Sequence, residues 1–204
     1  MRESFDSMAK AGFSEACDRN KDFILNVLKE AFANSTAILE IGSGTGQHVV
    51  YFSRQLPMLK WQPTDTSEYL DGLHQRVSIE APDNVNIPIE LDVRMQPWPV
   101  GCFDGVFSAN TLHFMSWSCV EQFFLGIGES LTNRGVLCVY GPFRYAGEFT
   151  SDSNARFDQH LKQMDTQKGI KDFEAINELA KAERLELIQD VAMPANNQML
   201  VWSR

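Results

Sequence analysis

Short apolar runs alternate with helical patterns along most of this chain. Apolar positions between Phe23 and Phe32 recur at helical spacing, and Asn34-Ser35 ends that predicted helix. The next run, from Ala37 to Ile41, is nearly continuous, as in a strand buried on both faces. Further strand-like runs lie at 59–63, 85–93, 105–109 and 135–140, with helical patterns between them at 49–56, 70–77 and 118–131. The alternation predicts a mostly parallel sheet with helices on both faces, an α/β doubly wound fold. Ser118 and Glu121 have the spacing of a capping box at the start of the last of these helices.

The C-terminal part departs from this alternation. Two strand-like runs, 186–193 and 198–203, are joined only by Pro-Ala-Asn-Asn, which is too short to hold a crossover helix. We therefore predict that the last two strands form an antiparallel hairpin. Before them, residues 145–169 form one long stretch outside the alternation, with an amphipathic helix around Leu161. This stretch is interpreted either as a lid above the carboxyl edge of the sheet or as a plain packing helix.

A glycine-rich loop follows the first predicted strand, in the run Glu40-Ile-Gly-Ser-Gly-Thr-Gly-Gln-His. Gly42 permits a tight turn, and Gly44 permits a close approach of backbone to a ligand. Gln47 stands where a dinucleotide-binding G-x-G-x-x-G loop has its third glycine, and the Gly-Lys-Ser/Thr of a P-loop is absent. A buried carboxylate at Glu40 repels polyphosphate and suits a ligand that carries a cationic amine. The alternative is a set of turn glycines without a ligand.

Three more polar residues end predicted strands. Asp65 follows the second strand at the distance from the glycines at which dinucleotide folds place a ribose-binding acid, about 20 residues. Its alternative role is to cap the turn at Thr66-Ser67. Asp92 and Asn110 follow the third and fourth strands. Since ligands of open α/β sheets bind along the carboxyl edge, we expect these groups to meet at one site.

Composition and charge narrow the class of protein. The chain has 204 residues, is 44% hydrophobic and carries a formal net charge of −9, which argues against a nucleic-acid-binding surface. Its four cysteines form no C-x-x-C pair, and no His pattern accompanies them, so no metal site is predicted. Thiols without a disulfide framework favour a reducing compartment, and no apolar run resembles a signal peptide or membrane span. We expect one cytoplasmic domain over 1–204, with an N-terminal segment at 1–20 and a candidate lid insertion at 143–170.

Several motifs together resemble those of class I S-adenosylmethionine-dependent methyltransferases. The loop at 39–48, Asp65, Asp92 and the closing strand pair carry this resemblance. Finer features are similar to the methyltransferase-like protein 26 group: Asp-Arg-Asn-Lys at 18–21, Trp-Gln-Pro-Thr-Asp at 61–65 and Tyr-Gly-Pro-Phe at 140–143. The resemblance implies a Rossmann-like, mostly parallel seven-stranded sheet with a C-terminal antiparallel hairpin. It also implies S-adenosylmethionine as cofactor and a small molecule as substrate.

The resemblance also assigns site residues. Glu40 and the loop backbone would face the methionine part of the cofactor, Asp65 the ribose, Asp92-Val93 the adenine, and Asn110-Thr111 the sulfonium end. Arg19 would close over the cofactor carboxylate or, alternatively, form a salt bridge at the helix start. The implied cofactor-binding set is Arg19, Glu40, Gly42, Ser43, Gly44, Thr45, Gly46, Asp65, Asp92, Val93, Asn110 and Thr111.

The sequence offers fewer signals for the catalytic and substrate-binding residues than for the cofactor-binding ones. His113 follows the fourth strand and is a candidate general base, with a structural hydrogen-bonding role as the alternative. As a base with an ordinary imidazole pKa, it would make turnover rise with pH near neutrality. Phe143, Arg144 and Tyr145 are candidate substrate contacts, and their mixture indicates an anionic or aromatic molecule. Two other functions compete with methyl transfer: a non-catalytic module that binds the cofactor as sensor or scaffold, and an NAD-dependent oxidoreductase, which Gln47 disfavours.

Overall fold

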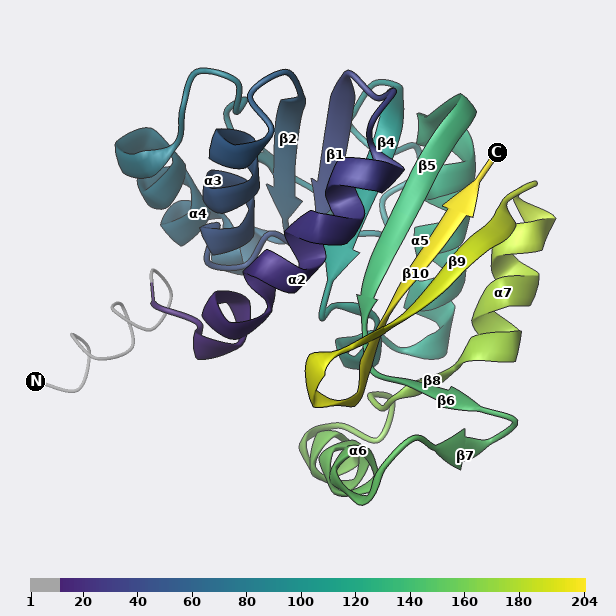
Figure 1. The fold of residues 1–204 in the computed structure, drawn as a ribbon. Coiled ribbons are helices and arrows are strands. Elements are labelled where there is room, and N and C mark those ends of the chain that lie inside the picture. The colour runs from purple at the N-terminus through teal and green to yellow at the C-terminus, as the bar shows by residue number, and fades with distance from the viewer. Residues whose placement is uncertain (1–11) are drawn as a thin grey trace, which may run out of the picture.

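The computed structural model describes residues 12–204 and contains one large sheet of seven strands, in the order β3-β2-β1-β4-β5-β10-β9 (Figure 1). The first five strands are parallel, and β10 lies antiparallel between β5 and β9. The strands are β1 (Ala37–Ile41), β2 (Lys60–Asp65), β3 (Ile89–Glu90), β4 (Phe103–Ala109), β5 (Leu131–Gly141), β9 (Glu186–Met193) and β10 (Asn197–Ser203). The predicted fold class and the C-terminal hairpin are confirmed.

Helices cover both faces of this sheet (Figure 1). One face carries α2 (Glu15–Ala31) and α3 (Gln47–Gln55), and α4 (Ser67–Glu80) follows beside α3. The other face carries α5 (Trp117–Ser130) and α7 (Phe173–Ala182). A hydrophobic core lies on each face of the sheet, and strand β1 contributes side chains to both. Ile38 packs with α2 and α3 on one face, and Leu39 and Ile41 pack with α5 on the other. This explains why its sequence is nearly continuously apolar.

Several predicted element bounds differ from the structure: α2 begins at Glu15, before its apolar pattern, and β5 begins at Leu131. Two further differences have a specific local cause. The strand predicted at 85–93 is paired only at Ile89–Glu90, apart from an isolated bridge at Val85. Pro88 has no N–H to donate to a ladder, and the carbonyl of Ile87 accepts a hydrogen bond from the Gln62 side chain instead (2.9 Å). Helix α5 begins two residues earlier than the capping box indicated. Its N-cap is Ser116, whose hydroxyl accepts from the Cys119 N–H.

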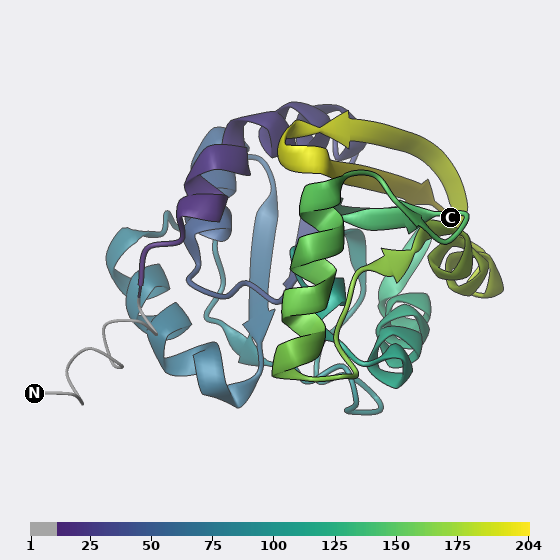
Figure 2. The same ribbon diagram turned by 90° about the horizontal axis from the view of Figure 1, so that it is seen from below.

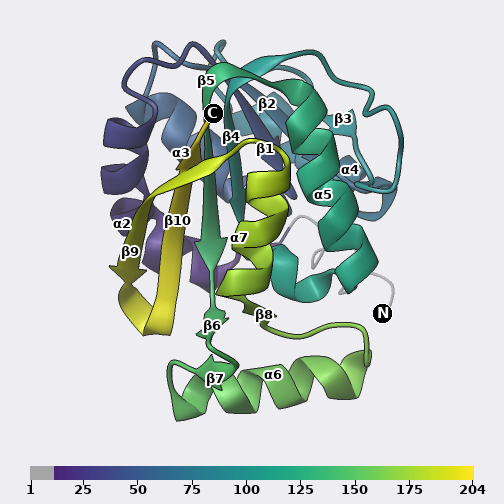
Figure 3. The ribbon, with the colours of Figure 1, turned by 90° about the vertical axis from the view of Figure 1, so that its right-hand side faces the viewer.

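A second, small sheet lies at the carboxyl edge of the large one. It consists of β6 (Phe143–Tyr145), β7 (Glu148–Phe149) and β8 (Lys171–Asp172), in the order β7-β6-β8. Helix α6 (Asp152–Met164) begins at the N-cap Ser151 and lies beyond this sheet (Figure 3). Seen from below, α6 extends across the side on which the parallel strands end (Figure 2). The predicted insertion therefore lies above the carboxyl edge, and whether it moves as a lid remains a prediction.

Within residues 12–204, no helix is long and apolar enough to cross a membrane. Part of the predicted N-terminal segment, residues 1–11, lies outside the described residues.

Candidate functional site

The glycine loop lies at the carboxyl end of β1 and is held by β2. Gly42 and Ser43 both donate their N–H to the carbonyl of Thr64, at 3.0 and 2.9 Å. Gly42 has a φ of +74°, and a Cβ there would lie 2.3 Å from the Thr111 side chain. Gly44 has a φ of +54°, and a Cβ there would meet nothing within 4 Å. Gly42 thus lets the loops after β1 and β4 pack together, whereas the space beside Gly44 is open to a ligand.

Glu40 is buried directly beneath this loop. It is 2% exposed, and the Ser43 hydroxyl donates to its Oε2 at 2.7 Å. Burial raises the pKa of Glu40 to about 7, against the lowering effect of the Ser43 hydrogen bond, and the nearby charge of Asp65 raises it further. A cationic group that reached this carboxylate would favour its ionised form.

Asp65 accepts hydrogen bonds both from the turn after β2 and from the glycine loop. Its Oδ1 accepts from the Thr66 N–H at 2.7 Å, as a turn cap does, and its Oδ2 accepts from the Gly44 N–H at 2.6 Å. Burial raises its pKa, and these two backbone hydrogen bonds oppose that rise. Oδ1 also accepts from the Thr66 hydroxyl at 3.5 Å, so the lone pair left to accept from a ligand hydroxyl is on Oδ2.

The loops after β3 and β4 supply the other predicted residues. Asp92 accepts from the Arg94 guanidinium at 2.9 Å, and this lowers the pKa of its carboxyl. Val93 is buried, and its carbonyl accepts from the Trp98 indole. Asn110 has a φ of +58° and donates its N–H to the carbonyl of Tyr140. The Thr111 hydroxyl lies 2.6 Å from that of Ser108, which donates to the carbonyl of Ile41.

His113 is buried beside the end of β4, between the rings of Phe114 and Phe157. Burial lowers its pKa to about 4, and the positive charge of Lys171 adds to this. The imidazole is therefore neutral near pH 7. If it acts as a base, the transition expected in turnover moves from near neutrality to near pH 4.

The three candidate substrate residues in β6 differ in their surroundings. Phe143 is 1% exposed and packs in the core between the sheet and α7. Tyr145 stacks on Phe173, and its hydroxyl donates to Asp190 at 2.8 Å. Arg144 contacts the Phe149 ring, with its guanidinium carbon 5.6 Å from the ring centroid. Of the three, Arg144 has one buried side-chain nitrogen, Nε, without a hydrogen-bond partner.

Comparison with known proteins agrees with this architecture. The family model described as "Protein of unknown function (DUF938)" matches residues 11–204. The chain belongs to the DUF938 family. Its fold is that of solved methyltransferases, including an O-methyltransferase family protein from Burkholderia thailandensis (TM-score 0.83, 17% identity, all of this chain and 61% of that one). An O-methyltransferase family 2 protein from Planctomyces limnophilus DSM 3776, in complex with apigenin, is also similar (TM-score 0.81, 14% identity, all of this chain and 62% of that one).

A third similar structure is human N-acetylserotonin methyltransferase in complex with SAM (TM-score 0.70, 13% identity, 93% of this chain and 58% of that one). The DUF938 chain thus spans about 60% of the length of these proteins. At such low identity the comparison shows the fold alone.

Two features of this DUF938 protein were missed from sequence. Arg19 is exposed in an ion pair with Glu15 (3.0 Å), but its neighbour Asn20 is buried and lies 2.7 Å from Nε2 of His48. Tyr140 accepts a hydrogen bond from Asn197 at 3.0 Å close to this pair. The Asp-Arg-Asn-Lys motif thus contributes a buried polar contact between α2 and α3. The second missed feature is Lys171, which had no motif to mark it.

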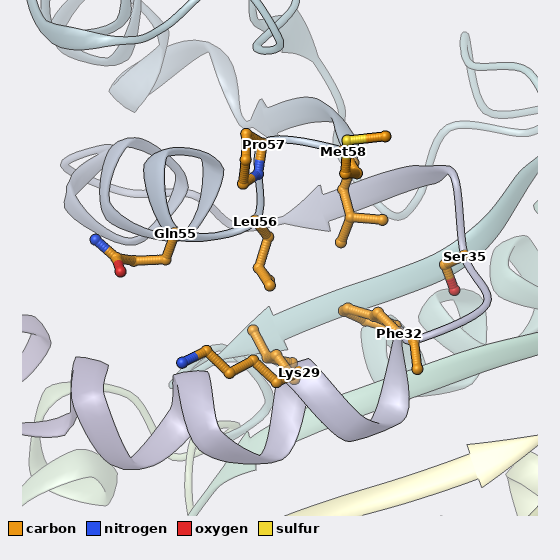
Figure 4. A pocket seen from close by; sticks show the side chains of 10 residues that line it. Lys29, Phe32, Ser35, Gln55, Leu56, Pro57 and Met58 are labelled. Atoms are coloured by element: carbon orange, nitrogen blue, oxygen red, sulfur yellow. The ribbon is translucent and has the colours of Figure 1, made fainter.

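A cavity of about 280 Å³ lies elsewhere, between the C-terminal ends of α2 and α3 (Figure 4). These helix ends precede β1 and β2, so the cavity is at the amino edge of the sheet, opposite the glycine loop. It is lined by Leu28, Lys29, Phe32, Ala33, Ser35, Gln55, Leu56, Pro57, Met58 and Leu59. It contains none of the predicted site residues.

Proposed function

We propose that this DUF938 protein is a S-adenosylmethionine-dependent methyltransferase that acts on a small molecule. The observation that carries the proposal is the carboxyl end of β1, where the space beside Gly44 is open, the Gly44 N–H donates to Asp65, and the neighbouring Ser43 hydroxyl donates to Glu40. Glu40 would accept from the ammonium group of the cofactor and Asp65 from its ribose. Asp92-Val93 would flank the adenine, and Asn110 and Thr111 the sulfonium end.

A ligand in one similar structure supports a small molecule as the methyl acceptor. The similar structure from Planctomyces limnophilus holds apigenin, a small aromatic ligand. When bound, the cofactor supplies an electrophilic methyl group, so the protein's main task is to align a nucleophile with it and exclude water. His113 is buried and neutral, and would accept the acceptor's proton where the acceptor is protonated. We also group the chain with methyltransferase-like protein 26, because of its motifs. We place it in the cytoplasm, because its four cysteines are free thiols, as expected in a reducing compartment.

Calorimetric titration with S-adenosylmethionine, S-adenosylhomocysteine and NAD tests the proposal. We expect binding of the first two and none of NAD. Gly44→Val should abolish binding, because the branched side chain occupies the ligand's space. Gly147→Val is a matched control: Gly147 also has a positive φ (+81°), open space around its Cβ and an N–H that donates to an aspartate.

If Gly44→Val binds S-adenosylmethionine as well as the parent does, while Gly147→Val is folded, the cofactor does not lie beside Gly44. A protein that binds the cofactor but transfers no methyl group to any member of a metabolite pool would be the non-catalytic module instead.

A further inference from the structure

The side chain of Gln47 forms a two-way hydrogen-bonded bridge to the start of α2. Its Oε1 accepts from the Ser14 N–H, and its Nε2 donates to the Ser14 carbonyl at 3.3 Å. Ser14 is the N-cap of α2, where its hydroxyl accepts from the Cys17 N–H and its carbonyl also accepts from the Asp18 N–H. Gln47 begins α3, directly after the glycine loop. The bridge therefore joins the starts of two helices that lie 33 residues apart in the chain.

The same amide oxygen also contacts the glycine loop. The Thr45 hydroxyl donates to Oε1 of Gln47 at 3.1 Å. Thr45 lies between Gly44 and Gly46, whose φ angles are +54° and +75°. Glycine leaves the backbone more conformational freedom than other residues do, so a hydrogen bond from the side chain between them restricts the loop. Gln47 is thus bonded both to the loop that is proposed to bind the cofactor and to the start of α2.

A second contact holds α2 on α3 independently of Gln47. Nε2 of His48 lies 2.7 Å from Oδ1 of Asn20, and both residues are 6% exposed. Further along α2, Ile24 and Leu28 are fully buried in the core. A change at Gln47 should therefore free the loop and the start of α2 without detaching the helix.

Gln47 can affect cofactor affinity through the loop that it restrains. A site whose loop is already held in the binding conformation loses less entropy when its ligand binds, and its affinity is higher for that reason. We propose that Gln47 is a positioning residue for the cofactor, which holds Thr45 and the N-cap of α2 in the conformation that binds S-adenosylmethionine. The effect is reciprocal, because a cofactor that binds more tightly when the bridge is closed must stabilise the closed bridge by the same factor. This inference rests on the proposed function, and it gives a role to the residue that stands in place of a dinucleotide loop's third glycine.

Calorimetric titration with S-adenosylhomocysteine tests the effect on affinity. Gln47→Met keeps the length of the side chain but forms none of its hydrogen bonds, and it should bind at least about fivefold more weakly than the parent. Asn84→Leu is the matched control. The Asn84 amide also ties two segments together, by donating to the carbonyls of Ser53 (3.1 Å) and Leu59 (2.8 Å), but it does so at the amino edge of the sheet. This variant should melt at a lower temperature than the parent and bind S-adenosylhomocysteine equally well.

Amide hydrogen exchange measures the reciprocal effect in the parent itself. Saturating S-adenosylhomocysteine should slow exchange of the Cys17 and Asp18 N–H groups, which bond to Ser14. The slowing should be by about the factor that Gln47→Met loses in affinity. In Gln47→Met the ligand should leave this exchange unchanged, because the bridge that carries the coupling is gone.

The outcomes separate this inference from the function beneath it. An affinity of Gln47→Met within twofold of the parent's overturns the inference, and so does an equal loss in Asn84→Leu, which would reflect lowered stability alone. Exchange at Cys17 and Asp18 that is the same in the parent with and without ligand also overturns it, whether or not the variant folds. In each of these cases, binding of S-adenosylhomocysteine by the parent still supports the methyltransferase. If the parent binds none, the proposed function fails and the inference fails with it.

Discussion

Cofactor affinity should depend on pH through Glu40. This carboxyl is buried with a pKa of about 7, and the proposed ammonium contact requires its ionised form. At pH 5.5 only about 3% of Glu40 would be ionised, against half at pH 7, so affinity should rise roughly 15-fold across this interval. An α-amino group titrates near pH 8, so this interval keeps the ligand's ammonium charged.

Calorimetry in buffers of different ionisation enthalpy measures both the affinity and the proton released on binding. At pH 7 we expect about half a proton to be released. Glu40→Gln should bind weakly and with a flat profile, because the amide cannot titrate. A flat profile in the parent would refute the contact between Glu40 and the ammonium group.

Glu40 should also make the stability of the free protein depend on pH, in the opposite direction to cofactor affinity. Because its pKa is raised in the folded state, Glu40 holds a proton between about pH 4.5 and 7 that the unfolded chain has lost. The contribution of Glu40 to the free energy of unfolding should therefore fall as pH rises through this window, by up to about 3 kcal/mol, whereas the contributions of His48 and His113, whose pKa values burial lowers to about 4, rise with pH. Urea unfolding of the parent and of Glu40→Gln across this range checks the sign. The free energy of unfolding of the parent, minus that of the variant, should fall between about pH 4.5 and 7, because the histidines contribute equally to both proteins.

Three other predictions concern the remaining parts of the site. Asp65→Ala should weaken cofactor binding by about ten- to a hundredfold in calorimetry; a change under twofold with a lowered melting temperature would leave Asp65 as a turn cap alone. His113→Ala should lower turnover about 10²- to 10⁴-fold with cofactor affinity intact, and the parent's turnover should show no His113 transition between pH 6 and 8; an ordinary imidazole transition there would contradict its burial. Amide hydrogen exchange in 145–169 should slow when cofactor and acceptor bind, and equal protection in every state would make this stretch ordinary packing.

The fold was largely predictable because its signals are local. A nearly continuous apolar run marks β1, and a four-residue link between two strand-like runs allows only a hairpin. The strand at β3 was overestimated because Pro88 has no N–H to donate to a ladder and its apolar neighbour Ile87 is 76% exposed, so pairing is confined to Ile89–Glu90 apart from the bridge at Val85. The small sheet was not predicted, since strands as short as Lys171–Asp172 leave no periodicity to read.

The candidate site was predictable only where residues are close in sequence to a strand end. The loop at 42–46 and Asp65 do meet, as their spacing indicated. Lys171 lies far along the chain from His113, and only the return of the chain after α6 brings its charge to that ring. The pKa of His113 depends on this burial and could not be read from its type alone. The raised pKa of Glu40 likewise depends on its burial and could not be read from its residue type.

A crystal structure of the protein with S-adenosylhomocysteine tests the central claim most directly. The account predicts the ligand across the carboxyl ends of β1, β2 and β4, with its ribose hydroxyls on Asp65 and its ammonium group directed towards Glu40. It also predicts that the ligand passes beside Gly44 without displacing the loop. A ligand bound elsewhere, such as in the cavity between α2 and α3, or at this edge without contact to either carboxylate, would contradict it.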